Sequence, residues 1–134
     1  MILTKYPFPE RSVLCIVGPT ATGKTAVGVH LADAYHGEII SCDSMQVYKG
    51  ISIASNKPSQ EELRVPHHVI DCVSITEEFD AAQYQRSATS AVDSVAARGC
   101  LPVVVGGTGM YLKSLLDGIF EGVQADEDIR RGLL

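Results

Sequence analysis

The segment SVLCIVGPTATGKT, residues 12–25, decides the fold of this chain. Its first six residues form a short, mainly apolar run, which is typical of a strand buried on both faces. From Lys24 onward, apolar residues recur at helical spacing, at Val27, Leu31 and Ala34. The segment therefore predicts a strand, a glycine-rich loop and a helix in immediate succession.

A second strand follows this helix within a few residues. Gly37 is expected to end the helix, and Glu38–Cys42 (EIISC) forms a short, largely apolar run that stops at Asp43. A strand, a helix and a strand within roughly 30 residues make a βαβ unit, whose strands are parallel. The carboxyl ends of parallel strands line a ligand crevice, so we expect Asp43 to face the glycine-rich loop from an adjacent strand end.

The rest of the chain continues the alternation of strands and helices. We expect a short helix over 60–63, a strand over His67–Val73, and a helix that Asp80 and Gln83 begin as a capping box and Gly99 ends. A third buried strand, residues 101–105 (LPVVV), then runs into a glycine-rich turn, residues 106–109, and a helix from about 110 to 116. The expected fold is α/β: a P-loop NTPase-like parallel sheet with flanking helices in a three-layer αβα arrangement.

Length and charge restrict the domain organisation and the partners. The 134 residues, 46% of them apolar, suffice for one core domain over 12–134 after an irregular lead-in over 1–11. A helix that Asp126 would cap breaks off within about two turns, so we expect a longer polypeptide. No apolar run approaches the ~20 residues of a membrane helix. We also expect the protein to be cytoplasmic and monomeric. The net charge of −5 means that a polynucleotide partner needs a local basic patch.

The cysteines and histidines give no sign of a metal centre. Four widely spaced cysteines without a C-x-x-C pair are expected to be reduced thiols in or near the core: Cys15, Cys42, Cys72 and Cys100. His67 and His68 are neighbours in a predicted strand, where successive side chains point to opposite faces, so they cannot hold one ion together.

The glycine-rich loop predicts a phosphate site. Residues 18–25 fit the pattern G-x-x-x-x-G-K-S/T between a predicted strand and a predicted helix. Backbone N–H groups and the positive end of the helix would hold a diphosphate, Lys24 would add a charge, and the Thr25 hydroxyl would ligate Mg²⁺. The residues expected to bind the diphosphate are Gly18, Pro19, Thr20, Ala21, Thr22, Gly23, Lys24 and Thr25.

The loop does not choose among hydrolases, kinases and transferases with a pyrophosphate leaving group. Hydrolytic motors add an acidic Mg²⁺ partner after a later apolar strand, and the best candidate, Asp71, follows only a weak apolar run. Asp43 could take a proton from a nucleophile or hold a metal-bound water. A cap on the turn that follows would use the same carboxylate for structure alone.

Four ordered blocks carry a resemblance to a known family. Together with residues 18–25, the block D-S-M-Q-V-Y-K-G (43–50) resembles the tRNA dimethylallyltransferases, also called tRNA isopentenyltransferases. Further similar blocks are N-K-P (56–58), P-H-H-V-I-D (66–71) and V-G-G-T-G-M-Y-L (105–112). They span about residues 12–118 in family order, and members of the family are about twice as long as this chain.

The resemblance implies transfer of a dimethylallyl group from dimethylallyl diphosphate to N6 of an adenosine beside the anticodon of a tRNA. Residues 18–25 would bind the diphosphate, in the place that a nucleotide takes in kinases, with Mg²⁺ as cofactor. Asp43 would be the base, and Thr108 would lie between the two substrates as a second catalytic residue. The anticodon stem-loop would contact Asp43, Ser44, Met45, Gln46 and Thr108.

Three alternatives remain open from the residues. One is an adenylate isopentenyltransferase that acts on free AMP, ADP or ATP. Another is a P-loop small-molecule kinase in which Asp43 binds a hydroxyl acceptor. The third is a chain that binds diphosphate without appreciable tRNA turnover, because its charge is acidic and half of the family's length is absent.

Overall fold

The computed structural model of the protein describes residues 12–19, 23–50 and 57–119. In chain order its helices and strands are β1 (Leu14–Val17), α1 (Lys24–Ala34), β2 (Gly37–Cys42), the 3₁₀ helix η1 (Glu62–Arg64), β3 (His67–His68), α2 (Ala81–Ala97), β4 (Leu101–Gly106) and α3 (Gly109–Ile119). The predicted lead-in over 1–11 and the helix expected from Asp126 lie outside these described residues.

The sheet is parallel throughout, but its strand order differs from the expectation. The order is β1-β4-β2-β3, so β4 lies between the two strands of the predicted βαβ unit. Cys15 on β1 pairs with Val104 on β4, and Ile40 on β2 pairs with the same residue from the other side. The prediction that β1 and β2 are adjacent in the sheet is therefore wrong. The apolar strand β4, whose residues are all buried, lies between them.

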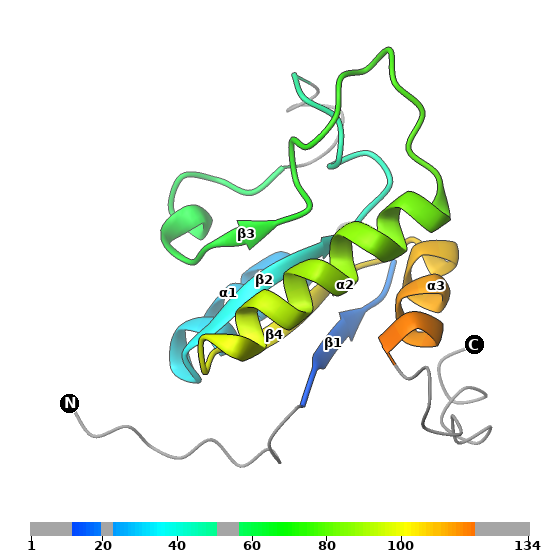
Figure 1. Ribbon diagram of the computed structural model, residues 1–134. Coiled ribbons are helices and arrows are strands. Elements are labelled where there is room, and N and C mark those ends of the chain that lie inside the picture. The colour runs from blue at the N-terminus through cyan, green and yellow to red at the C-terminus, as the bar shows by residue number, and fades with distance from the viewer. Residues whose placement is uncertain (1–11, 20–22, 51–56, 120–134) are drawn as a thin grey trace.

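Helices cover both faces of the sheet, which makes the predicted three layers (Figure 1). On one face, Val29 and Ala32 of α1 pack against Ile39, Val103 and Val105. Gly28 lets α1 approach closely, since a Cβ atom there would lie 2.5 Å from a methyl group of Val105. The other face packs against α2 and α3 through a second cluster that includes Ile40, Val104, Tyr84, Ala88, Val92, Tyr111 and Leu115.

The capping box predicted for α2 is confirmed. The Asp80 carboxylate accepts from the Gln83 backbone N–H at 2.8 Å, and the Gln83 side chain accepts from the Asp80 N–H at 2.8 Å. The helix ends at Ala97, two residues before Gly99, whose φ of +74° is in the left-handed region that glycine favours. Local sequence alone therefore fixes both ends of this helix.

The end of α1 and the course of the chain around β3 correct two predictions. The left-handed residue after α1 is His36, with φ of 55°, and Gly37 already begins β2. Gly37 is needed there because a Cβ atom would lie 2.7 Å from the Leu101 carbonyl oxygen.

The predicted strand over 67–73 is wrong beyond His68: positive φ angles at Val69 and Asp71 turn the chain out of the sheet.

The remaining expectations concern short elements and cysteines. The short helix expected over 60–63 is the 3₁₀ helix η1, displaced toward the carboxyl end. All four cysteines are free thiols, but Cys72 is exposed, which contradicts its predicted place in or near the core. No helix in the described part of the chain is long and apolar enough to cross a membrane.

Candidate active site

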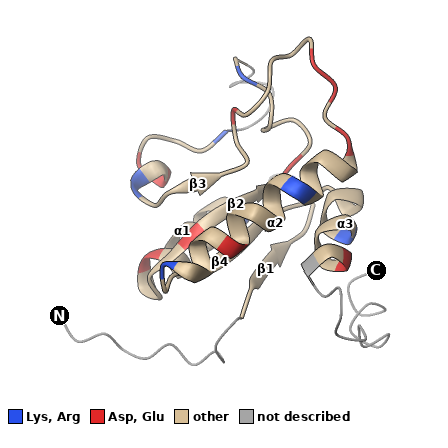
Figure 2. Ribbon diagram, in the orientation of Figure 1, with Lys and Arg blue, Asp and Glu red and all other residues tan. Residues whose placement is uncertain are grey.

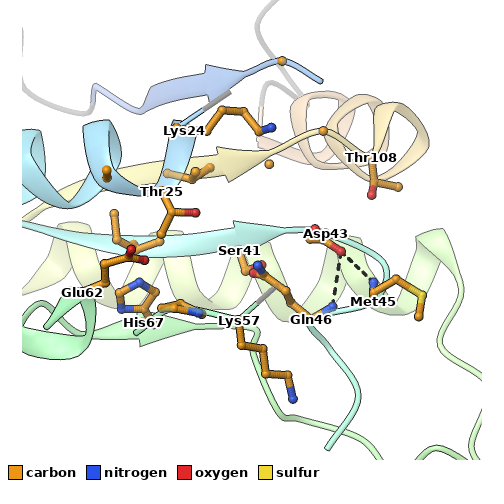
Figure 3. A pocket seen from close by; sticks show the side chains of 18 of the residues that line it. Lys24, Thr25, Ser41, Asp43, Met45, Gln46, Lys57, Glu62, His67 and Thr108 are labelled. Carbon is orange, nitrogen blue, oxygen red and sulfur yellow. Dashed lines mark hydrogen bonds between the residues drawn. The ribbon is translucent and has the colours of Figure 1, made fainter. Parts of the chain in front are cut away.

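A cavity of about 480 Å³ opens at the carboxyl ends of the strands, on the face of the sheet that α1 covers. The end of β1 and the start of α1 contribute Gly18, Pro19, Gly23, Lys24 and Thr25. The turns after β2 and β4 contribute Asp43, Ser44, Met45, Gln46, Gly107 and Thr108. Figure 3 shows Lys24 and Thr25 on one side of this space and Asp43 on the other.

The first turn of α1 gives the cavity the character of an anion site. Gly23 precedes the helix with φ of +81°, and no side chain among the described residues caps its free N–H groups. Those N–H groups and the positive end of the helix dipole favour a negatively charged ligand. The Lys24 ammonium group donates to the Pro19 carbonyl oxygen, which turns the lysine back toward the end of β1. Residues 20–22 of the predicted phosphate loop lie outside the described residues.

Two glycines at the end of β4 bring the strand ends together. A Cβ atom on Gly106 would lie 2.1 Å from the Cys42 carbonyl oxygen, and one on Gly107 would lie 2.6 Å from the Gly18 carbonyl oxygen. Only glycine permits such backbone approaches. The end of β4 therefore fills the space between the phosphate loop and the turn after β2.

Thr108 follows these glycines and joins the two sides of the cavity. Its backbone N–H donates to the Cys42 carbonyl at 3.2 Å, and its Oγ1 accepts from the Ser44 backbone N–H at 3.1 Å. The Cys42 thiol donates to the Thr108 carbonyl at 3.7 Å, and burial raises the pKa of this thiol to about 11. Because Oγ1 accepts from Ser44, the hydroxyl proton of Thr108 can be donated to a ligand.

Asp43 caps the turn that follows β2. Its Oδ1 accepts from the backbone N–H of Met45 at 2.8 Å and from that of Gln46 at 3.3 Å. The structural role considered from the sequence is thus present. It uses one carboxylate oxygen only, because within the described ranges Oδ2 receives no hydrogen bond. The turn therefore holds the carboxylate at the edge of the cavity through one of its two oxygens.

Residues from the segment after this turn complete the cavity, and sequence reasoning gave them no role there. Lys57 donates to the Tyr48 carbonyl at 2.6 Å and forms an ion pair with Asp71. Asp71, the candidate acidic Mg²⁺ partner, pairs with Lys57 and is not itself among the described residues that line the cavity. The block N-K-P (56–58) was the available signal for Lys57.

His67 lies at the far end of the cavity, beside Glu62 and below Thr25 in Figure 3. Its Nδ1 is 2.7 Å from the Val65 carbonyl oxygen, and burial lowers the pKa of the imidazole. His68 points elsewhere and lies 2.8 Å from the Glu38 carboxylate. The two imidazoles therefore contact different partners, Val65 and Glu38.

The fold and the cavity define a class of protein before any comparison. The chain is a P-loop α/β protein, because it combines a parallel sheet, a loop of phosphate-binding pattern between β1 and α1, and a cavity at the carboxyl ends of the strands. Residues 46–134 match the family model for IPP transferases, and the chain belongs to this family.

Individual relatives agree with this assignment. The chain is 48% identical over 123 residues to tRNA dimethylallyltransferase 2 of Geotalea uraniireducens (strain Rf4). This alignment covers 91% of this chain and 40% of that protein. The full-length tRNA isopentenylpyrophosphate transferase of Bacillus halodurans superposes with a TM-score of 0.78 at 44% identity, over 91% of this chain and 41% of its own. A eukaryotic dimethylallyltransferase acting on tRNA superposes with a TM-score of 0.74 at 40% identity, over 77% of this chain and 26% of its own. The chain spans about two fifths of the length of the curated relatives it matches.

Proposed function

We propose that the protein transfers a dimethylallyl group from dimethylallyl diphosphate to N6 of the adenosine next to the anticodon of a tRNA. One observation carries the proposal: a single cavity presents Lys24 and Thr25 to a diphosphate and Asp43 to a nucleophile. The family membership supports the choice of substrates. Because both sides of the cavity come from one chain, we propose that it acts as a monomer.

The donor side stabilises the leaving group. As the bond between the allylic carbon and the diphosphate oxygen breaks, negative charge builds on the diphosphate. The N–H groups at the start of α1 and the Lys24 ammonium group would stabilise that charge where it develops. Thr108 would donate its hydroxyl proton to a diphosphate oxygen, since its Oγ1 already accepts from Ser44.

The acceptor side removes a proton. The lone pair of an adenine amine is delocalised into the ring, so N6 attacks the allylic carbon well only if its proton is taken as the new bond forms. Oδ2 of Asp43 would take that proton, while Oδ1 accepts the two hydrogen bonds of the turn. The products are an N6-dimethylallyl adenosine, diphosphate and a protonated Asp43, which returns its proton to solvent.

Mg²⁺ is the cofactor that we propose. The Thr25 hydroxyl lines the cavity and would be a ligand of the ion. Mg²⁺ prefers few protein ligands, with waters and phosphate oxygens completing its shell. Thr25 would hold the ion against the diphosphate, whose charge the ion would help to neutralise.

The tRNA contact proposed for this part of the chain is directed at bases. Figure 2 shows Lys and Arg scattered among Asp and Glu over the described elements, rather than gathered in a basic stripe along them. The turn of Asp43, Ser44, Met45 and Gln46 lies beside the cavity, where a base flipped out of the anticodon loop would reach Asp43.

Isotope transfer tests the proposal. The protein, expressed from its complete reading frame, is incubated with Mg²⁺ and labelled dimethylallyl diphosphate in the presence of tRNA or of AMP. A parallel reaction contains γ-labelled ATP. We expect label from the isoprenoid in tRNA. Label in free nucleotide would establish an adenylate isopentenyltransferase instead, and transfer of the γ-phosphate would establish a kinase.

A further inference from the structure

The segment after β3 is fastened along the turn that carries Asp43. The Asp71 N–H donates to the Gln46 carbonyl at 2.9 Å, and the Cys72 N–H donates to the Val47 carbonyl at 2.8 Å. Gln46 in turn donates its own backbone N–H to Oδ1 of Asp43 at 3.3 Å. The backbone of Gln46 therefore joins the Asp43 carboxylate to the segment that contains Asp71.

This segment follows an unfavourable backbone path. Val69 has a φ of 60° and Asp71 a φ of 52°, in the left-handed region that residues other than glycine avoid. For Val69 the conformation is especially costly, because its side chain is branched at Cβ. Strained conformations of this kind persist only where surrounding contacts hold them. The position of Asp71 beside Gln46 therefore depends on contacts from elsewhere in the chain.

Lys57 supplies such contacts. Its ammonium group donates to the Tyr48 carbonyl at 2.6 Å and forms an ion pair with the Asp71 carboxylate, so one cation joins the two segments. The Lys57 side chain is only 9% exposed, and loss of the Asp71 carboxylate would leave a nearly buried charge without its counter-ion. Figure 3 shows this side chain extending away from Lys24 and Thr25. The Lys57 ammonium group is thus engaged with the protein and not with the donor side of the cavity.

We propose that Lys57 and Asp71 are positioning residues, whose ion pair holds the turn that presents the Asp43 carboxylate to the acceptor amine. The inference rests on the proposed function. Without the ion pair, the segment at Asp71 can relax from its strained path and release the Gln46 carbonyl. The N–H groups that orient the carboxylate would then shift with the turn. A displacement of about 1 Å at a catalytic group can cost roughly a hundredfold in rate, so a contact outside the reacting atoms can control the chemical step.

The test compares variants of the protein expressed from its complete reading frame. Asp71→Asn removes the charge with little change of shape, and Lys57→Met removes the ammonium group but keeps an unbranched side chain. Asp33→Asn is the matched control: its carboxylate is 60% exposed, against 52% for Asp71, and it pairs with Arg64. Neither residue of this control pair is among the described residues that line the cavity.

Each substitution is made in the parent and in Asp43→Asn, which lacks the proposed base. Circular dichroism identifies a temperature at which the variants are folded. At that temperature, calorimetry measures the Kd for dimethylallyl diphosphate, and a single-turnover assay measures the rate of transfer to the anticodon stem-loop.

We expect Asp71→Asn and Lys57→Met each to lower the single-turnover rate roughly ten- to a hundredfold without changing the Kd for the donor. Asp33→Asn should match the parent in both measurements. In Asp43→Asn, the same two substitutions should change the rate by less than about twofold, because no base is left to be positioned. A contact that served the fold alone would not lose its effect in this way.

A parent-like rate in folded Asp71→Asn or Lys57→Met would overturn the inference, and so would a weakened affinity for the donor. An equal loss of rate with and without the Asp43 carboxylate would also overturn it. Lys57→Met decides the question if Asp71→Asn proves too unstable to purify. These outcomes leave the proposed transfer intact, whereas a parent protein that modifies no tRNA would overturn both.

Discussion

Asp43→Asn separates the two roles that the structure gives to one carboxylate. The substitution keeps an oxygen at the Oδ1 position, where the N–H groups of Met45 and Gln46 donate at 2.8 and 3.3 Å. Asparagine caps such turns as aspartate does. The second oxygen becomes an NH₂ group, which cannot accept a proton from the adenine amine.

The expected magnitudes follow from these contacts. Hydrogen bonds to a charged acceptor contribute about 1.5–3 kcal/mol and those to a neutral one about 0.5–1.5 kcal/mol, so the turn loses only part of its stabilisation. General base catalysis contributes about 10²- to 10⁴-fold in rate, which corresponds to about 3–5 kcal/mol in the activation free energy. We therefore expect a loss of more than about a hundredfold in rate with little change in folding.

A single-turnover assay measures the rate of transfer to tRNA at saturating donor, and calorimetry measures donor affinity. Donor affinity should be retained in Asp43→Asn, because the carboxylate lies across the cavity from Lys24 (Figure 3). Asp43→Ala serves as the comparison, since it removes the cap as well and should also lower the free energy of unfolding. A rate for Asp43→Asn within threefold of the parent would refute the role of Asp43 as the base.

Three further predictions address the donor site and the fold. Lys24→Ala should weaken dimethylallyl diphosphate binding by about tenfold or more, because a charge facing the diphosphate is lost; unchanged affinity by calorimetry would place the donor elsewhere. Gly106→Ala should destabilise the protein by about 1–3 kcal/mol or more, since its new methyl group would overlap a backbone carbonyl of β2. Gly109→Ala, where a Cβ atom meets nothing within 4 Å, is the matched control in denaturant unfolding. Burial raises the pKa of Glu38, but hydrogen bonds from Arg98 and His68 outweigh it, so the pKa lies below its ordinary value of 4.5. Because the pKa is lower in the folded state, the ionised Glu38 stabilises the protein above about pH 4.5, and this stabilisation is lost as the carboxylate is protonated. The difference in the free energy of unfolding between the parent and Glu38→Gln should therefore narrow as the pH falls below about 4.5 and should not widen.

Residues that signal their structure locally were predictable. Asp80, Gln83 and Gly99 are adjacent in sequence to the helix ends that they define, and the β4 run is apolar because it is buried on both faces. The phosphate loop pattern and the block around Asp43 identified both sides of the cavity in the same way. The turn after Asp43, which the sequence offered as an alternative to catalysis, proves compatible with it, because a carboxylate has two oxygens.

Long-range contacts account for what the sequence did not predict. The segment after His68 resembles a strand, yet Val69 and Asp71 leave the sheet where Lys57 pairs with Asp71. Such an ion pair joins residues far apart in the chain and leaves no periodic pattern.

By itself, the sequence determined the kinds of elements and the phosphate-loop pattern between β1 and α1, because propensity, capping and loop chemistry act over a few residues. Only the tertiary structure decided that β4 lies between β1 and β2, that Thr108 thereby joins the two sides of the cavity, and that Lys57 pairs with Asp71. These features depend on which surfaces pack together when the chain folds, and packing partners are set by shape and burial across the whole domain.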